Sequence, residues 1–355
     1  MRSQASSLYS DFNDPIAGEA EVGEASLEDL WFMPGPIEEQ PDDLPPGPLA
    51  DRRETAVLDD WRSAEAGQVA RLARVAGRVG ALDERLKRGP EGWRHRLALI
   101  EAADLSWFAG DRIGPDRLAL WISLRLSGVQ DDTSELTRVG WAVRSLTGGP
   151  GPEVDLSAFL DRRDPKTVAH EAETFADRTG GWLDLIAQTT DLHPISRACM
   201  CFHLWSFAGL GQHGDRMEAA VTAARIAAGE GKGAIFAPLS MGGAGGLRAG
   251  GAPSERLTRW LVWMEAACLT AMRHLDAIEA WSARAESEMT QLSGKTPPSL
   301  CAVLAEWPLV SVRMAEAMSK ASRAAVQRNL ARMEARGLIR EVTGQGRYRM
   351  WRAAT

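Results

Sequence analysis

From about residue 55 onwards, apolar residues recur at intervals of three and four, the spacing of one face of an α-helix. One or two helices with apolar positions such as Trp61, Leu72 and Leu82 end near Gly89-Pro90. Further helices are predicted over 93–108, 118–126, 136–146, 167–178, 181–190, within 196–228 on either side of a loop, and over 254–292. The stretch 118–126 is apolar enough for a strand, but its helical neighbours favour a buried helix. The chain is predicted to be mainly α.

Glycines are concentrated in residues 229–251, which we predict to be a surface loop or flap. The long helix that follows has one apolar face, formed by Leu257, Leu261, Met264, Cys268, Leu275 and Ile278. Trp260 and Trp263 on this helix suit core packing better than a dimer contact.

The last part of the chain, 311–352, has the pattern of two short helices followed by a hairpin. Ser311 is placed to cap the first helix, residues 319–321 form a turn, and Ser322 is placed to cap the second. The first helix has its apolar positions at Val312, Ala315 and Met318, and the second at Val326, Leu330 and Met333. Gly337 stands where a glycine commonly ends a helix.

Two short strands are predicted at 338–342 and 347–351, joined by the turn 343–346. Helix, turn, helix and hairpin in this order predict a winged helix-turn-helix with a small β-hairpin wing. We place its start at residue 296, after a hinge at 295–298.

Charge favours DNA as the partner of this segment. Residues 311–352 contain nine Arg and one Lys against three Glu, a net charge of +7, whereas the whole chain carries −7. A basic module on an acidic protein is typical of phosphate binding. The alternatives are a solvated basic face and a winged helix that binds protein.

The expected interface divides into base and phosphate contacts. Four outward residues of the second helix suit the major groove: Arg323, Ala324, Gln327 and Arg328. Phosphate contacts are expected from Lys320, Arg332, Arg347 and Arg349, with Gln345 at the wing tip near the minor groove and Ser322 at the helix start. One winged helix buries too little surface for tight specific binding, so a homodimer on a palindrome of double-stranded DNA is expected.

Three regions are predicted: an acidic, Pro-rich and disordered tail at 1–54, a helical domain at 55–295, and the winged helix at 296–355. Residues 1–60 contain fifteen acidic residues against three Arg. The apolar patch 27–33 suits a short helix that covers the domain surface, and a tail that competes with DNA is the alternative. The chain shows neither a signal-peptide pattern nor a membrane-spanning apolar run, and its four cysteines suit a reducing cytoplasm.

The segment 193–216 has an apolar helix, then a loop with Gly209, Gly211 and Gly214, then the start of another helix. It resembles the Fic fold, in which such a loop cradles phosphate between two helices, and the resemblance covers about 60–355. The chain also resembles a bacterial family of helix-turn-helix DNA-binding proteins of unknown function. The resemblance implies a Fic-like helical domain ahead of the winged helix, and a nucleotidyl (AMP) transferase as the alternative function.

The Fic signature reads His-Pro-Phe-x-(Asp/Glu)-Gly-Asn-Gly-Arg, and residues 208–216 read Ala-Gly-Leu-Gly-Gln-His-Gly-Asp-Arg. Ala208 occupies the position of the general base and cannot accept a proton. Gln212 replaces the carboxylate that would hold magnesium. We therefore expect a degenerate, non-catalytic domain without a cofactor, serving dimerisation or ligand sensing. A residual anion pocket for a small molecule or nucleotide would consist of His213, Gly214 and Arg216, and a plain helical scaffold is the alternative.

Other motifs have a structural interpretation. Cys199, Cys201 and His203 lack a second pair of ligands at zinc spacing, so buried structural cysteines are expected. Residues 231–233 do not complete a P-loop. A DNA-binding regulator, a Fic-type enzyme and a protein–protein scaffold remain as function classes, and the substitutions at Ala208 and Gln212 favour the first.

Overall fold

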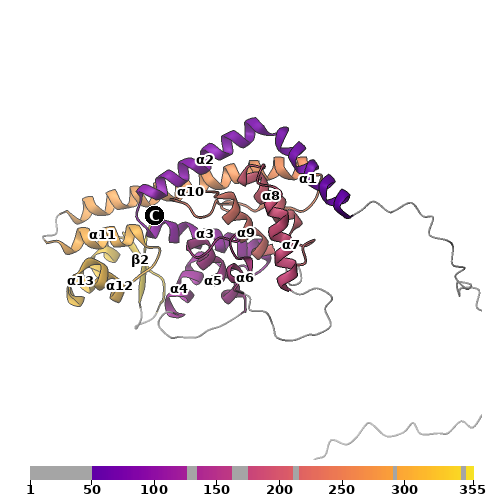
Figure 1. Ribbon diagram of the computed structural model, residues 1–355. Coiled ribbons are helices and arrows are strands. Elements are labelled where there is room, and N and C mark those ends of the chain that lie inside the picture. Colours follow the sequence, from indigo (N-terminus) through magenta and orange to yellow (C-terminus); the bar gives the residue numbers. More distant parts are fainter. Residues whose placement is uncertain (1–49, 126–133, 162–174, 211–215, 291–293, 345–348) are drawn as a thin grey trace, which may run out of the picture. The chain divides into compact units, whose positions relative to one another are not determined.

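The computed structural model describes residues 50–125, 134–161, 175–210, 216–290, 294–344 and 349–355 (Figure 1). Thirteen α-helices and three short strands are found among these residues, which confirms a mainly α chain. The apolar patch 27–33 and most of the predicted tail lie outside the described residues. Residues 50–54, predicted to belong to the tail, instead form the start of α1 (Ala50–Ala66).

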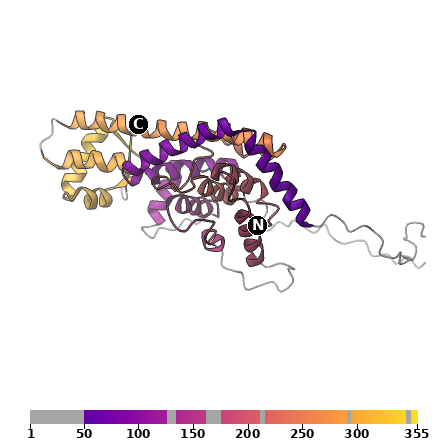
Figure 2. The same cartoon turned by 45° about the horizontal axis from the view of Figure 1, so that its top comes forward.

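Two long helices, α2 (Val69–Arg88) and α10 (Pro253–Met289), run side by side (Figures 1 and 2). Arg85 of α2 joins them, because its guanidinium lies 2.7 Å from the Asp276 carboxylate and 2.8 Å from that of Glu279. The predicted apolar face of α10 is buried throughout, and Trp260 belongs to the same core. Helix α10 therefore contributes buried side chains to the core along most of its length.

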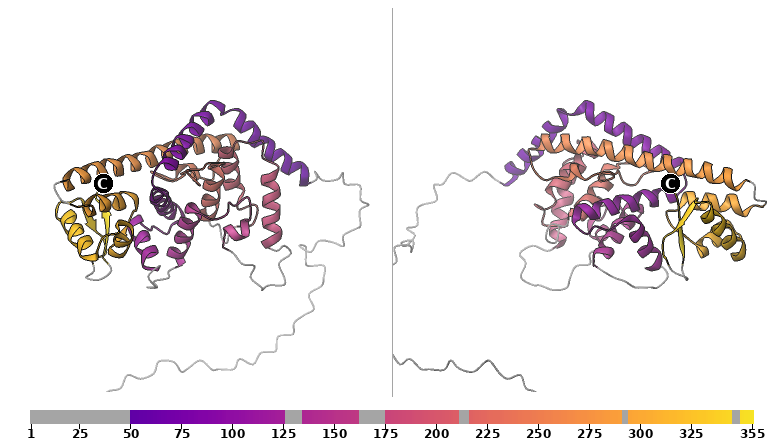
Figure 3. Two further views of the ribbon diagram at one scale, coloured as in Figure 1. Left: turned by 60° about the vertical axis from the view of Figure 1, so that its left-hand side comes forward. Right: turned by 180° about the vertical axis from the view of Figure 1, so that it is seen from behind.

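Further helices pack beneath this pair (Figure 3), and three of them contact α9 (Arg216–Ala227). Small residues dominate α9, and nearly all of them are buried, so neighbouring helices can approach closely. The bounds of these helices are α3 (Gly92–Ala109), α4 (Pro115–Arg125), α5 (Ser134–Thr147), α8 (Pro194–Leu204) and α9 (Arg216–Ala227). The apolar stretch 118–126 thus lies largely within a helix, as its neighbours indicated.

The prediction of separate helices at 167–178 and 181–190 is wrong for its described part. After the short α6 (Leu156–Phe159), one helix, α7 (Phe175–Ala187), continues through Gly180 and Gly181. Each glycine inside a helix costs about 1 kcal/mol relative to alanine. Burial of Trp182, whose ring meets that of Trp205 edge-on at 5.6 Å, offsets this cost.

The Gly-rich segment 229–251 is not a surface flap, because much of it is buried. The Asp83 carboxylate accepts hydrogen bonds at 2.7 Å from the amides of both Gly233 and Ala234. A Cβ at Gly233 would overlap the backbone of α2, so only glycine fits there. The segment therefore packs against α2 as part of the core.

A second carboxylate holds the same segment from α3. Glu101, which is fully buried, accepts hydrogen bonds from the amides of Leu239 (2.8 Å), Ser240 (3.0 Å) and Met241 (3.2 Å). Burial raises the pKa of Glu101 to about 7, although the amide donors oppose that shift. These backbone amides are thus occupied by the protein's own carboxylates, and residues 231–233 leave no open phosphate cradle.

The C-terminal part contains three helices and a three-stranded antiparallel sheet of strand order β1-β3-β2. In chain order the elements are α11 (Thr296–Glu306), β1 (Val310–Ser311), α12 (Val312–Ser319), α13 (Arg323–Ala335), β2 (Ile339–Glu341) and β3 (Met350–Ala353). The predicted hairpin is present, but its second strand begins at Met350 and ends at Ala353, two residues beyond the predicted end, with Ile339 opposite Ala353. Strand β1, too short for a sequence pattern, was not predicted.

Residues 295–298 were predicted to be a hinge, but Lys295 is the N-cap of α11 and residues 296–298 form its first turn, where Pro297 is buried. The Arg96 guanidinium donates to three carbonyls at the other end of α11, those of Leu304, Ala305 and Trp307, at 2.7–3.2 Å. Trp281 of α10 donates its indole N–H to the Leu338 carbonyl at 2.6 Å. Residues Ala50–Thr355 form one compact unit, and the domain boundary at 295/296 stays a prediction.

Candidate nucleic-acid interface

A serine caps the start of each of the helices α12 and α13, and one left-handed residue lies between the two helices. Ser311 accepts a hydrogen bond from the Met314 amide at 3.2 Å, and Ser322 accepts one from the Ala325 amide at 3.4 Å. Lys320 has φ +54°, which turns the chain between the helices and leaves its side chain exposed. Both predicted caps are confirmed, and the Ser322 hydroxyl is occupied as a cap acceptor.

Helix α13 ends as predicted at Gly337, whose φ is +68°. The Leu338 amide donates to the Met333 carbonyl at 3.0 Å, and the Gly337 amide donates to the Glu334 carbonyl at 2.9 Å. This pair of bonds is the Schellman arrangement, which favours glycine at the left-handed position. It fixes where the chain leaves the helix and enters β2.

The inner face of α13 consists of Val326, Leu330 and Met333, each fully buried. Asn329 is also buried, and its amide nitrogen donates to the Ala325 carbonyl at 2.8 Å. The predicted apolar stripe is confirmed, so the opposite side of the helix is directed outward.

The outer face of α13 is exposed and consists of small and polar side chains: Arg323, Ala324, Gln327, Arg328, Ala331 and Arg332. At about 100° per residue, Ala324, Arg328 and Ala331 occupy its centre, whereas Arg323 lies about 140° from Arg328. Alanine side chains let the helix backbone approach a partner closely. The sequence reading missed Ala331, which the same helical spacing could have revealed.

The Arg323 guanidinium lies 4.0 Å from the Glu316 carboxylate of α12. Arg323 is thus near the edge of the outer face, and the structure does not group it with Arg328. Among residues the sequence reading did not select, Arg313, Arg336 and Arg340 are also exposed. These three arginines contribute to the net charge of residues 311–352, but no spacing in the sequence placed them at the interface.

On the sheet side, Arg349 is held by a carboxylate and a ring. Its guanidinium lies 3.1 Å from the Glu334 carboxylate and 4.9 Å from the centre of the Trp351 ring. The Trp351 indole N–H also donates to Glu334 at 3.3 Å. Arg349 therefore already has an anionic partner, while Gln345 and Arg347 lie outside the described residues.

The predicted anion pocket is described only at Arg216, because His213 and Gly214 lie outside the described residues. Arg216 is the first residue of α9, is exposed, and lies 5.4 Å above the Phe108 ring. Leu210 is buried, and Ala208 lies in the turn after α8.

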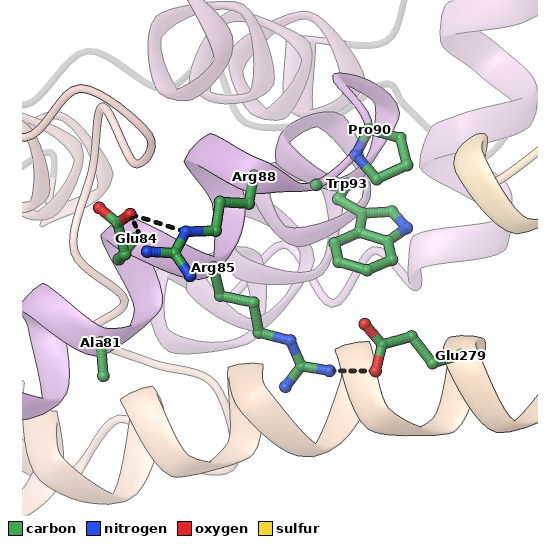
Figure 4. A pocket seen from close by; sticks show the side chains of 8 residues that line it. Ala81, Glu84, Arg85, Arg88, Pro90, Trp93 and Glu279 are labelled. Atoms are coloured by element: carbon green, nitrogen blue, oxygen red, sulfur yellow. Dashed lines mark hydrogen bonds and ion pairs between the residues drawn. The ribbon is translucent and has the colours of Figure 1, made fainter.

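A surface pocket of about 520 Å³ lies elsewhere, between α2, the start of α3 and α10 (Figure 4). Its cations are paired: Arg88 lies 2.8 Å from Glu84, and Arg85 lies 2.8 Å from Glu279. Trp93 forms an apolar wall beneath Arg85. None of the predicted site residues lines this pocket.

Cys199 and Cys201 are buried free thiols, and no group of residues that could hold a metal ion occurs in the described part of the chain. None of the described helices combines the length and apolar character that crossing a bilayer requires. Comparison of the sequence with protein-family models and with curated proteins finds no match.

Proposed function

We propose that residues 296–355 are a winged helix-turn-helix that binds double-stranded DNA, and that the chain is a sequence-specific transcriptional regulator. The order helix, strand, helix, helix, strand, strand supports this proposal. So does the sheet order, in which a strand ahead of the helix pair joins the C-terminal hairpin.

The observation that carries the proposal is the outer face of α13. An α-helix fits the major groove of B-DNA, and close approach is easiest where its central side chains are small. Ala324 and Ala331 meet that need, while Gln327 and Arg328 offer amide and guanidinium donors beside them. Gln327 suits an adenine edge and Arg328 suits a guanine edge.

Positive charge around this face would supply the phosphate contacts. Lys320 and Arg332 are exposed, and Arg349 would exchange or share its Glu334 partner. The net charge of +7 over 311–352 favours a polyanion even though the whole chain is acidic. A homodimer on a palindromic site would double these contacts.

The helical body would serve dimerisation or ligand sensing. With Ala208 at the position that the Fic-like alignment gives to the general base, we propose no nucleotidyl transfer activity. Labelling with ATP and magnesium tests this part: self-labelling that is lost in Arg216→Ala would overturn it.

Fluorescence anisotropy with a labelled mixed-sequence duplex tests the DNA interface. Arg328→Gln/Arg332→Gln should weaken binding at least tenfold, because both arginines lie on the outer face of α13. Arg74→Gln/Arg78→Gln removes the same charge from the exposed side of α2 and should leave binding nearly unchanged. Equal losses in the two double variants would contradict this interface.

A further inference from the structure

Two arginines in the first turns of α10 lack a carboxylate partner among the described residues. Arg256 and Arg259 are both half-buried, and the Nε–H of each is buried without an acceptor there. Within the described ranges, Arg259 donates only to carbonyls, those of Arg248 at 2.9 Å and Gly250 at 2.6 Å. Arg85 on the neighbouring α2, in contrast, has two carboxylate partners.

A buried imidazole lies on the helix that faces them. His203 of α8 is 7% exposed, and its Nε2 has no hydrogen-bond partner in the described part of the chain. The neighbouring Phe202 ring lies 5.7 Å from the Trp260 ring, which sets this turn of α8 against the first turns of α10. The Trp61 ring is stacked with the His203 ring, with ring centres 6.1 Å apart.

Across this contact between α8 and α10, the charges of both arginines act on His203. Burial, followed by the charges of Arg256 and Arg259, lowers the pKa of His203 to about 4. The same two arginines act on Cys199, one helical turn before His203, where burial raises the pKa and their charges oppose the rise. Cys199 and His203 share one face of α8, so both arginines act on that face, and no described carboxylate pairs with them.

We propose that His203, Arg256 and Arg259 form a binding site for a phosphate group. Two guanidinium charges match a phosphate dianion, and the imidazole Nε2–H and the guanidinium N–H groups would donate to its oxygens. The half-buried arginines leave one side open to solvent, whereas the buried imidazole excludes the backbone of duplex DNA. The ligand is thus free phosphate or a small phosphate monoester, and the site is independent of the proposed DNA interface.

The test uses the full chain labelled with ¹⁵N-histidine, titrated with sodium phosphate and, separately, with sodium chloride at matched ionic strength. The His203 signal, identified by its loss in His203→Asn, should shift and saturate with phosphate but not with chloride. Arg256→Gln should weaken phosphate affinity at least tenfold. Arg273→Gln removes an exposed charge of the same helix, where Arg273 donates to Thr270, and should retain wild-type affinity.

Phenyl phosphate distinguishes the two ligand sources. Tighter binding than inorganic phosphate would support a monoester, and weaker binding would support free phosphate. An equal response to chloride, no saturable response in the wild-type chain, or unchanged affinity in Arg256→Gln would each overturn the site. The wild-type titration stays informative even if a variant fails to fold. Because it contains no DNA, its failure would not bear on the proposed DNA interface.

Discussion

At the scale of single residues, buried polar groups connect distant parts of this chain. Glu101 on α3 accepts three backbone hydrogen bonds from 239–241, although it is fully buried. A carboxylate in such a place lowers the free energy of the fold only while its acceptors are matched by donors. Its substitution should therefore show which protonation state the fold prefers.

Glu101→Gln should lower the free energy of unfolding by about 1–3 kcal/mol, because the new amide donor faces a backbone N–H. The loss should also depend on pH. The pKa of Glu101 rises from 4.5 to about 7 on folding, so the folded chain holds a proton that the unfolded chain releases between these values. The wild-type advantage should be largest below pH 4.5, fall by about 3 kcal/mol as the pH rises from 4.5 to 7, and stay constant above pH 7.

Urea unfolding of both proteins at a series of pH values measures this difference. Glu288→Gln, an exposed position on α10, is the control and should change little. A wild-type advantage that grows with pH would contradict the assignment.

Two buried tryptophans provide a second comparison at this scale. The Trp281 indole donates to the Leu338 carbonyl, whereas the Trp260 indole has no partner among the described residues. Trp281→Phe should therefore cost about 1 kcal/mol more than Trp260→Phe, since both lose similar volume and only one loses a hydrogen bond. Thermal unfolding of the two variants measures the difference, and equal losses would mean that this bond adds no stability.

At the scale of elements, the sequence correctly predicted helix ends, because the bonds that define them join residues close together in the sequence. Ser311, Ser322 and Gly337 mark helix ends through bonds that span three to five residues. The segment 229–251 was misread because its anchors are remote: Asp83 lies 150 residues from Gly233, and Glu101 lies 138 residues from Leu239. Glycine content indicates conformational freedom, but close packing uses glycine equally well.

For the candidate interface, the sequence likewise predicted which α13 side chains are exposed, but not their contacts with distant residues. Helical spacing correctly gave Arg323, Ala324, Gln327 and Arg328 as exposed, and Arg332, expected to contact phosphate, is exposed as well. It could not give the pairing of Arg349 with Glu334, because that contact depends on how β3 lies against α13.

Substitutions on the outer face of α13 should separate base contacts from phosphate contacts. Gln327→Ala should change sequence preference, at a cost of about 1–3 kcal/mol at one base pair. Arg332→Ala should weaken all sequences about equally and reduce the salt dependence of binding. Selection from a randomised duplex library, followed by affinity measurements at two salt concentrations, separates these outcomes. If both variants change preference in the same way, the proposed division between base and phosphate contacts is wrong.

At the scale of the whole molecule, the proposed DNA-binding part is joined closely to the helical body. Arg96 bonds three carbonyls at the end of α11, and Arg352 lies 2.9 Å from Asp116 of α4. A ligand that shifts the body could therefore shift α13 with it, which suits a regulator. The acidic remainder of the chain, with a net charge of −14 outside 311–352, would also restrict DNA to the basic face.

The central claim is that this chain binds DNA through phosphate contacts around α13. Its most direct test is the affinity of the purified full-length chain for a labelled duplex, measured by anisotropy at 50 and 200 mM salt. If a homodimer makes roughly eight phosphate contacts, affinity should fall by roughly 10³–10⁵ over this range. An affinity that does not change with salt, or the absence of binding at 50 mM, would contradict the claim.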